Sequence, residues 1–259
     1  EVVASLLIGA DGAHSAVRQQ LGIELGGVTG IQREFMGGKM FAIYLRAPQF
    51  LSALQSPRAW MYVAVNRGRR AFMASVDGLS EYAFHAALRP GEDGEGWTEA
   101  DARRVFTEAV GVDVPIEILS MGTWLAGHAL VAQRFQKGRV FIAGDAAHLF
   151  TPTGGLGYNT AVEDAVNLGW KLASVIRDQA PLALLDSYEA ERRPLAERNT
   201  GYARKFADSV GLFAAKPGLE EASARGDAER KLAGLHFDAH ARLEFNIPGV
   251  TFGGRYDGS

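Results

Sequence analysis

Residues 138–159 read GRVFIAGDAAHLFTPTGGLGYN. The apolar run Val140–Ala143 predicts a short buried strand. Gly144 and Asp145 end that strand, and a loop containing Pro152 follows. After Gly157 the chain has its clearest helical pattern, in which apolar residues recur at intervals of three and four. These residues are Ala161, Ala165, Leu168, Leu172 and Val175. The stretch therefore predicts a strand, a sharp loop and a long helix.

The loop between this strand and helix carries groups expected of a ligand site. Asp145 stands at the carboxyl end of the strand, where open α/β sheets bind their ligands. Gly154, Gly155 and Gly157 have no side chains, so backbone N–H groups can approach a planar or anionic ligand. The N-terminus of the following helix adds positive partial charge. Turn capping by Asp145 alone is the alternative, but the combination of strand, Gly-Asp, glycine loop and helix favours a ligand site.

A second segment, near the N-terminus, repeats this architecture. Leu6–Ile8 predicts another buried strand, and a short helix capped by Ser15 is expected to follow and to stop at Gly22. Asp11, in the turn between them, could orient backbone amides towards a pyrophosphate, and Arg18 could supply positive charge. Asp-Gly is also a common turn dipeptide, so a purely structural role stays open.

The composition excludes several classes of protein. The 259 residues include no Cys, which rules out disulfides, thiolate zinc sites, cysteine nucleophiles and iron–sulfur clusters. No apolar run approaches the roughly 20 residues needed to span a bilayer. The 30 acidic and 27 basic residues give a net charge of -3 without a long basic block, so nucleic-acid binding has little support. With no signal-peptide pattern, a cytoplasmic protein is expected.

The remaining pattern predicts a mixed α/β (α+β) fold. Short β-rich stretches between residues 32 and 88 are typical of an antiparallel sheet, with a hairpin signal at 64–71. Thr98 is expected to cap a helix, and Pro194 to kink a later one. The predicted strands are 40–45, 60–65, 71–76, 82–88 and 116–124, and the further helices are 98–110, 182–206 and 219–235, followed by an extended tail.

Three segments resemble a known family. Gly9–Arg18 resembles the "DG" motif, and Gly144–Asn159 the "GD" motif, of the FAD-dependent aromatic hydroxylases, the class A flavoprotein monooxygenases. Para-hydroxybenzoate hydroxylase and the phenol hydroxylases are members, and polyketide-tailoring oxygenases are relatives. Ser187–Pro194 is also similar to the family. The resemblance covers most of the chain and is weakest, a matter of pattern only, at 32–124.

The resemblance implies the domain organisation. The chain would hold part of a FAD-binding, Rossmann-like domain of the glutathione-reductase type, with an inserted antiparallel-sheet domain for the substrate. The implied parts are FAD-binding segments 1–30 and 125–210, a substrate-binding sheet 31–124 that roofs the flavin, and a C-terminal helical or extended segment 211–259. The family's Gly-x-Gly-x-x-Gly segment, which cradles the FAD diphosphate, has no match here. An enzyme incomplete at its N-terminus is therefore expected.

The resemblance also implies the site residues. Asp145 would hold the FAD ribitol, and backbone at 157–159 would contact the flavin, whose edge becomes negative on reduction. Pro152 would lie beside the ring, with no side chain assigned as catalyst. From their position before the strand 140–143, Met121 and Trp124 are the candidate substrate contacts, with core packing as the alternative, and no metal is expected. The full set of implied cofactor-binding residues is Asp11, Gly144, Asp145, Gly154, Gly155, Gly157, Tyr158 and Asn159.

The implied activity is hydroxylation of a small aromatic, phenolic substrate with FAD, NADH or NADPH, and O2, through a flavin C4a-hydroperoxide. Two alternatives stay open. One is a tailoring oxygenase that epoxidises or oxidatively decarboxylates a polycyclic substrate, and the other is a non-catalytic fragment. The sequence does not specify the substrate, the choice between NADH and NADPH, a catalytic base or the oligomeric state.

Two further sets of polar residues have structural interpretations. His148 follows Asp145 closely but has no second ligand at metal spacing, so it is expected to be a structural hydrogen-bonding residue. Arg192 and Arg193 are expected to pair on a helix surface with neighbouring glutamates or adjacent elements.

Overall fold

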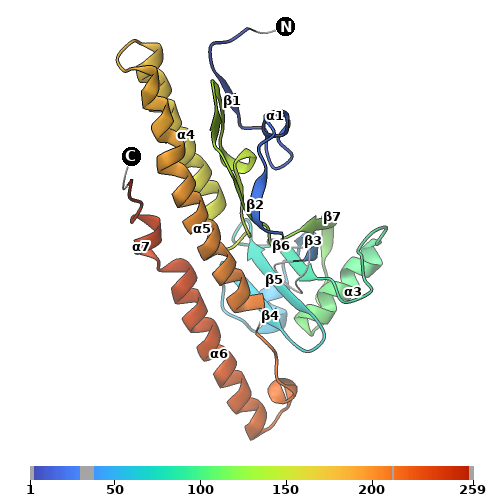
Figure 1. The fold of residues 1–259 in the computed structure, drawn as a ribbon. Helices are drawn as coiled ribbons and strands as arrows, with labels where there is room; N and C mark the ends of the chain where they lie inside the picture. Colours follow the sequence, from blue (N-terminus) through green and yellow to red (C-terminus); the bar gives the residue numbers. More distant parts are fainter. Residues whose placement is uncertain (1–2, 30–37, 212, 257–259) are drawn as a thin grey trace. The chain divides into compact units, whose positions relative to one another are not determined.

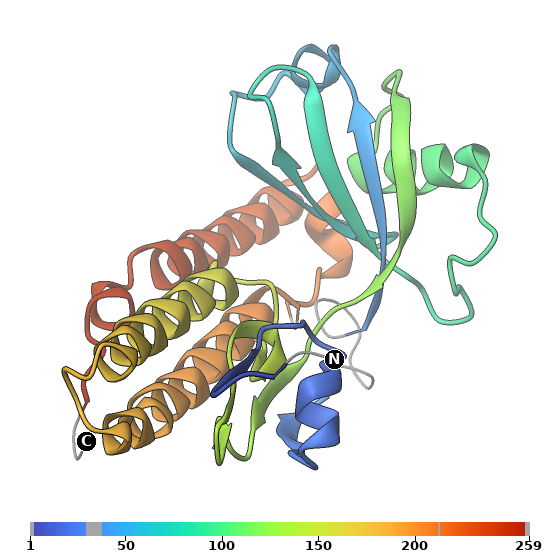
Figure 2. The ribbon, with the colours of Figure 1, turned by 90° about the horizontal axis from the view of Figure 1, so that it is seen from above.

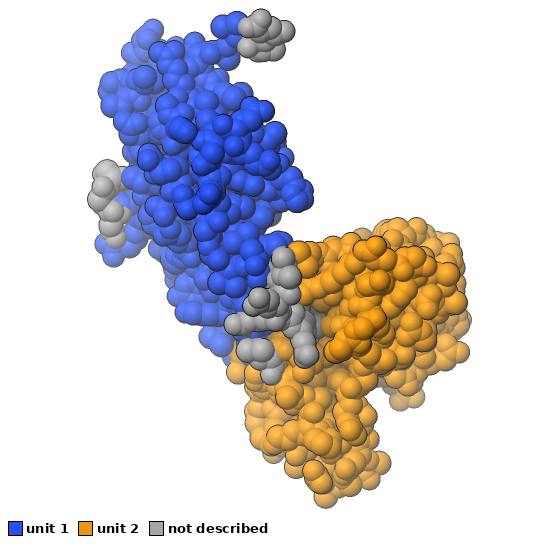
Figure 3. All heavy atoms as spheres, turned by 45° about the vertical axis from the view of Figure 1, so that its right-hand side comes forward, with its two compact units in different colours: residues 1–30, 127–210, 240–259 blue, residues 31–126, 211–239 orange. Residues whose placement is uncertain are grey.

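The computed structural model describes residues 3–29, 38–211 and 213–256, and the chain divides into two compact units. Unit 1 consists of residues 1–30, 127–210 and 240–259, and unit 2 of residues 31–126 and 211–239 (Figure 3). Each unit combines segments that lie far apart in the sequence. The segment 211–259, expected as one C-terminal piece, is shared between the two units.

Unit 1 contains two small sheets. In the first, β1 (Leu7–Gly9) pairs in parallel with β10 (Val140–Ile142), which in turn pairs antiparallel with β9 (Gln136–Lys137). The second sheet has β8 at its centre, and its strands are β2 (Leu25–Val28), β8 (Ala129–Ala132) and β11 (His148–Leu149). Because parallel strands end at the same sheet edge, the residues after β1 and β10 lie close together.

Two long helices, α4 (Leu156–Ile176) and α5 (Ser187–Gly211), lie side by side in unit 1 (Figures 1 and 2). A single helix was expected over 182–206. The structure has a 3-10 turn, Leu182–Asp186, followed by the helix α5, which contains Pro194. A short helix α1 (Ala16–Gln20) follows β1, and Ser15 caps it as predicted. No helix in the described part of the chain is both long and apolar enough to cross a membrane.

One prediction about burial in unit 1 was wrong, and a second was incomplete. Leu7 and Ile8, expected in a buried strand, are 48% and 44% exposed. The apolar face predicted for α4 is confirmed in part, because Leu168 is buried and Leu172 and Val175 pack against the core, whereas Ala165 is exposed. The buried side chains of α4 include Asp164, Asn167 and Lys171, while Val162, Val166 and Trp170 are exposed. The polar residues are inside because α5 supplies their partners.

Unit 2 is built on one antiparallel sheet, as predicted (blue to green in Figure 2). The structure adds the order of its five strands, β4-β5-β6-β3-β7. The strands are β3 (Lys39–Arg46), β4 (Met61–Val65), β5 (Arg70–Ser75), β6 (Glu81–Ala87) and β7 (Glu117–Leu125). The helices α2 (Phe50–Leu54) and α3 (Glu99–Val110) complete the unit's core. Thr98 forms the predicted N-cap of α3 in a reciprocal capping box with Asp101.

The two faces of this sheet differ in burial. One face packs against α2 and α3 through fully buried side chains such as Phe41, Ile43 and Phe84. The opposite face, which we call the open face, is only partly buried. Its residues, placed by the strand register, include Ala42, Tyr44, Phe72, Ala74, Ala83, His85, Gly122 and Trp124, and also Met40, which is fully buried.

The last long helix extends further than the sequence predicted. A 3-10 turn, Pro217–Glu220, precedes α6 (Ala224–Phe245), which continues ten residues beyond the expected end at Leu235 and runs from unit 2 into unit 1. The short helix α7 (Pro248–Thr251) follows where an extended tail was expected. The residues after Leu235 include Ala, Arg, Leu and Glu, which are good helix formers, so local propensity outweighs the weak apolar pattern.

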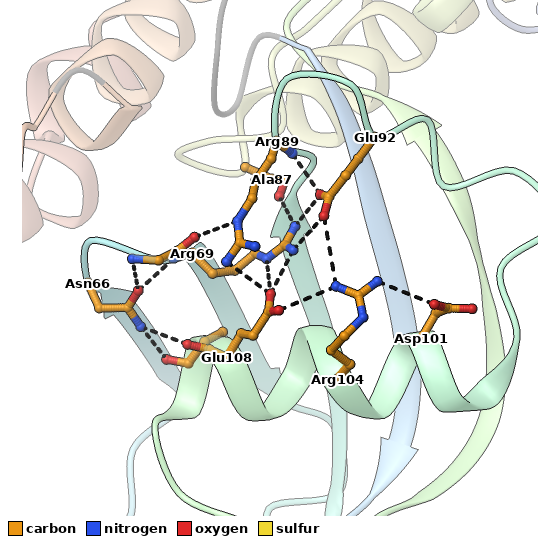
Figure 4. Close-up of polar contacts among 10 residues, drawn as sticks. Asn66, Arg69, Ala87, Arg89, Glu92, Asp101, Arg104 and Glu108 are labelled. Carbon is orange, nitrogen blue, oxygen red and sulfur yellow. Dashed lines mark hydrogen bonds and ion pairs between the residues drawn. The ribbon is translucent and has the colours of Figure 1, made fainter.

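A buried arginine ties the β4–β5 hairpin to α3 (Figure 4). The Arg69 side chain is fully buried and donates to both carboxylate oxygens of Glu92, at 2.6 and 2.9 Å. It also donates to Glu108 on α3, at 2.7 and 3.1 Å. Asn66 completes the attachment, because its side-chain amide donates to the carbonyls of Glu108 and Ala109 at the end of α3. Two carboxylates compensate the desolvation of one guanidinium.

Replacing Arg69 with Met should destabilise the protein by about 3 kcal/mol, because two partly buried carboxylates lose their shared partner. Arg104→Met is the matched control. Its guanidinium is 44% exposed and pairs with the same Glu108, so its loss should cost under about 1 kcal/mol. Urea denaturation of both variants measures the two values, and equal losses would contradict this account.

The Arg69 contribution should depend on pH in a defined direction. The hydrogen bond from Arg69 holds the pKa of Glu92 below its usual range. A carboxyl whose pKa is lowered by folding contributes stability that is complete above the ordinary glutamate pKa and is lost as pH falls through the folded value. The difference between wild type and Arg69→Met should therefore shrink on acidification.

Candidate functional site

The two acid-bearing turns predicted from the sequence lie next to each other in unit 1. Gly9 at the end of β1 is in register with Ile142 at the end of β10, and the Ala143 N–H donates to the Gly9 carbonyl at 3.1 Å. Asp11 and Asp145 follow within three residues of these positions. Both turns therefore leave the same edge of the sheet, at the strand ends where α/β proteins bind ligands.

Arg18 joins the two turns. Its guanidinium is buried and donates to the carbonyls of Ala146, at 2.9 Å, and Ala13, at 3.0 Å. The sequence suggested that Arg18 offers charge to a pyrophosphate, but its donors are engaged with the protein backbone instead. Arg18 therefore fixes the spacing of the turns that carry Asp11 and Asp145.

Asp11 uses its carboxylate to hold its own turn. It accepts hydrogen bonds from the Ser15 hydroxyl and from the Val17 N–H, at 3.1 Å. These bonds, that of Ser15 first, lower the pKa of Asp11. The carboxylate also lies at the N-terminus of α1, where negative charge is favourable. Asp11 is thus a structural anchor that sets the direction of neighbouring backbone amides.

Asp145 differs from Asp11 in having an unused carboxylate. Its side chain is exposed, and no group within the described residues donates a hydrogen bond to it. The backbone beside it is fixed, because Gly144 adopts a φ of +60° and its N–H donates to Asp164 at 3.2 Å. A rigid loop therefore presents a carboxylate that the fold itself does not use.

A buried charge network lies beneath this loop. Asp164 of α4 binds the His148 Nε2 at 2.6 Å and the Arg192 Nε at 2.8 Å, and all three side chains are at most 1% exposed. The same carboxylate accepts the Gly144 N–H. Arg192 is thus buried and pairs with α4, not on a helix surface as expected. The network connects α4, α5 and the loop after β10.

His148 has the structural role that its spacing predicted, since its Nε2 bonds to Asp164. The described part of the chain contains no cluster of three or more His, Asp or Glu side chains suited to a metal ion. Sequence reasoning missed Asp164, although its position four residues before buried Leu168 gave a signal. A carboxylate on the inward side of a helix must be paired.

The glycines of the loop serve different purposes. A Cβ at Gly154 would lie 2.9 Å from the Phe206 ring, and its φ of +69° also disfavours a side chain. The Gly154 N–H donates to Glu244 at 2.7 Å, and Glu244 pairs with His240 at 2.6 Å. A Cβ at Gly157 would lie 3.3 Å from Phe150. Packing within unit 1 therefore already requires glycine at 154 and disfavours a side chain at 157.

The N-terminus of α4 remains available for a ligand. Gly155 occupies the N-cap position with a φ of +63°, and no side chain caps the helix. Pro152 and Tyr158 are exposed, Tyr158 by 79%. The Asn159 amide donates to the Gly155 carbonyl at 2.7 Å, so Asn159 shapes the loop. The first turn of a long helix thus presents uncapped N–H groups in the same loop system as Asp145.

In unit 2, the two candidate substrate contacts lie on opposite faces of the sheet. Met121 is in register with Ile43, on the side of α2 and α3, whereas Trp124 belongs to the open face. Residues three apart in a regular strand always point to opposite sides, so the sequence spacing already contained this information. A cavity of about 940 Å³ beside β4, β5, α2 and α3 is lined by neither residue.

Sequence reasoning also missed His85, which lies on the open face next to Trp124. The Trp124 Nε1–H donates to the His85 Nδ1 at 3.0 Å, and Phe72 stacks on the imidazole with ring centroids 4.6 Å apart. Burial lowers the pKa of His85. Trp124 is therefore part of an ordered aromatic group and not an isolated apolar side chain.

Residues 1–203 match the protein family described as "FAD binding domain". Over 238 residues the chain is 39% identical to a putative polyketide hydroxylase of Streptomyces halstedii, covering 84% of this chain and 39% of that protein. It is 33% identical to the 2,4-dichlorophenol 6-monooxygenase of Cupriavidus pinatubonensis, covering 97% of this chain and 44% of the relative.

A solved structure is also similar to this chain. The rebeccamycin biosynthetic enzyme RebC with reduced flavin superposes with a TM-score of 0.83 at 33% identity, covering 98% of this chain and 47% of RebC. The chain thus spans less than half the length of these three relatives.

Replacing Asp164 with Asn should destabilise the protein by about 3 kcal/mol or more, because the buried Arg192 guanidinium loses its fully desolvated partner. Glu163→Gln is the matched control. Glu163 pairs with the same Arg192 but is 48% exposed, so its loss should cost under about 1 kcal/mol. The free energy of unfolding in urea measures both. A loss for Asp164→Asn no larger than for the control would show that the network is not the main support of the loop.

Proposed function

Because the chain belongs to the FAD-binding flavoprotein monooxygenases, we propose that the protein hydroxylates a phenolic aromatic substrate with FAD, O2 and either NADH or NADPH. One observation carries the proposal. The turns of Asp11 and Asp145 leave adjacent parallel strands at the same edge, and the loop after β10 leads to the uncapped N-terminus of α4. This arrangement supports binding of a cofactor that has hydroxyl groups, which a carboxylate can bind, and a ring edge that becomes negative on reduction, which a helix N-terminus can stabilise.

The residues present fit FAD. The Asp145 carboxylate has no donor among the described residues and can accept hydrogen bonds from ribitol hydroxyls. Backbone N–H groups at Gly155, Gly157 and Tyr158 are proposed to bind the polar edge of the ring system. Pro152, exposed in the same loop, is proposed to lie beside the ring. Asp11, Gly144, Gly154 and Asn159 are proposed to act indirectly, by holding the backbone of the two turns.

Bound FAD would supply the redox chemistry, with NADH or NADPH as the electron donor and O2 as the source of oxygen. The chain itself orients the cofactor and stabilises negative charge on it. Asp145 anchors the cofactor, and the N-terminus of α4 favours negative charge near its first turn. The network of Asp164, His148 and Arg192 fixes the loop before a ligand arrives, so these groups need little reorganisation on binding.

Unit 2 is proposed to bind the substrate with the open face of its sheet. Phe72, His85 and Trp124 give this face an aromatic surface with one polar group, which suits a planar aromatic ligand. Met121 is not proposed to share this surface, because it lies on the other face. The assignment of FAD binding to 1–30 and 125–210, and of substrate binding to 31–124, is part of the proposal.

A second candidate is oxidation of a larger polycyclic substrate. It is favoured by the similarity to a putative polyketide hydroxylase and to the rebeccamycin biosynthetic enzyme. The two candidates share the cofactor chemistry and differ in the size of the ring system that the open face would receive.

Asp145→Ala should weaken FAD binding by about tenfold or more without lowering the unfolding midpoint of the apoprotein, since the carboxylate supports no contact within the described residues. Asp11→Ala should instead lower the unfolding midpoint, because it removes the anchor of the turn before α1. Flavin fluorescence titration and thermal unfolding of the full-length protein measure the two effects. Unchanged FAD affinity in Asp145→Ala would overturn its assigned role.

The full-length protein, reconstituted with FAD, should oxidise NADH or NADPH faster when an aromatic hydroxyl compound is present. The panel should include 2,4-dichlorophenol, 2-naphthol and a phenolic polyketide. Mass spectrometry after reaction under ¹⁸O2 should detect a product carrying one labelled oxygen atom. Protein that retains no FAD, or that oxidises the nicotinamide equally with and without every compound, would contradict the proposed function.

A further inference from the structure

The tautomer of a histidine on the open face is set by a tryptophan. The indole of Trp124 donates its Nε1–H to the Nδ1 of His85 at 3.0 Å. An indole nitrogen can only donate, so Nδ1 must act as the acceptor and carry no proton. The neutral imidazole then holds its proton on Nε2.

The environment of His85 favours this neutral form. Burial lowers the pKa of its imidazole, and no carboxylate within the described residues pairs with it. In unit 1, by contrast, His148 and His240 each contact a carboxylate, Asp164 and Glu244 respectively. His85 is therefore a neutral hydrogen-bond donor at pH 7 and not a cation.

The ring of His85 is also held in place on both sides. The Phe72 ring lies nearly parallel to it at 15°, and the Trp124 ring meets it edge-on at 85° with centroids 5.5 Å apart. Strand β3 runs between β6 and β7, and the residue that it places opposite His85 is Ala42. This small side chain leaves room for the indole to reach His85 across β3.

The Nε2–H is the one polar position of this ring without a partner among the described residues. The residues in register beside it, Phe72 and Ala42, are apolar. One pair further along lie Ala74, Ala83 and Tyr44, and the Tyr44 hydroxyl is already used as a donor to Glu81. A single oriented donor within an apolar surface is typical of a ligand site, where a few polar groups fix the orientation of a largely apolar molecule.

We propose that His85 donates its Nε2–H to an oxygen on the aromatic ring of the substrate, and that Trp124 is the positioning residue that keeps the proton on Nε2. This inference rests on the proposed function and narrows its substrate class to rings that carry an acceptor oxygen, such as a phenol or a phenolate. An unsubstituted ring would leave a partly buried donor unpaired. In this tautomer His85 orients the substrate and does not take the phenolic proton.

The first test examines the tautomer without any ligand. In full-length protein labelled with ¹⁵N-histidine, the His85 signals, assigned with His85→Gln, should show a protonated Nε2 and an unprotonated Nδ1 at pH 7. Trp124→Phe keeps an aromatic ring but removes the donor, so the tautomer with a protonated Nδ1 should appear. Trp60→Phe is the matched control, because Trp60 is 61% exposed outside the open face, and it should change nothing. A wild-type His85 with a protonated Nδ1 overturns the proposal.

The second test measures the substrate contact. His85→Phe keeps the stacking on Phe72 but has no donor, so the KM for 2,4-dichlorophenol and 2-naphthol should rise about tenfold. His85→Gln carries an amide N–H near the position of Nε2 and should recover most of the loss. Trp124→Phe should give an intermediate KM. Trp60→Phe is the matched control here as well, and its KM should equal that of the wild type.

The outcomes separate this inference from the proposed function. If the wild-type protein with FAD responds to neither phenol, the proposed function fails and this inference fails with it. If it responds but the KM of His85→Phe is unchanged, only the role of His85 is overturned. Should His85→Phe fail to fold, Trp124→Phe decides, and an unchanged KM in that variant overturns the proposal.

Discussion

The candidate site depends on one buried carboxylate. Burying an ionised group is costly unless its oxygens are paired, and Asp164 is fully buried. Its partners come from three places, the Gly144 N–H and His148 in the loop after β10 and Arg192 on α5. Moving the loop away from α4 would remove two of these three partners and leave one buried carboxylate oxygen unpaired. This penalty gives the loop one conformation and thereby fixes the neighbouring Asp145.

The four carboxylates of unit 1 that lie at the site differ in what they do for the fold. Asp164, Asp11 and Glu244 all bind backbone N–H groups, at Gly144, Val17 and Gly154, and so maintain the turns. Asp145 binds none of the described residues, so its replacement is expected to leave the fold unchanged. Because Asp145 is rigidly placed but makes no contact that the fold needs, it is the carboxylate to which a binding role is best assigned.

Much of the fold could be predicted because it depends on local patterns. Alternating residues predicted the strands of unit 2, and Ser15 and Thr98 correctly marked helix starts. Burial was predicted less well because it depends on partners elsewhere in the sequence. Nothing near Asp164 or Lys171 indicates that α5 pairs with them. Likewise, the apolar spacing of α4 does not show which side chains of other elements pack against its inward face.

The functional residues show the same limit. The glycine loop and Asp145 were recognisable as a motif, but His85 became a candidate only when the sheet register placed it beside Trp124. The two residues are 39 positions apart, and a third strand, β3, lies between their own. In contrast, the opposite orientation of Met121 and Trp124 followed from the two-residue period of a strand and could have been deduced without a structure.

Segments of the two units alternate along the sequence, and this order has a consequence for folding during protein synthesis. Leu7 pairs with Val140, so β1 must wait for β10 to be translated, roughly ten seconds later at typical elongation rates. The strands of unit 2 are complete at Leu125, before β10 leaves the ribosome. If unit 2 condenses first, it brings its two ends together and shortens the flexible loop that must close to join β1 to β10. The inserted sheet would then act as an internal folding aid for the parallel pair around it.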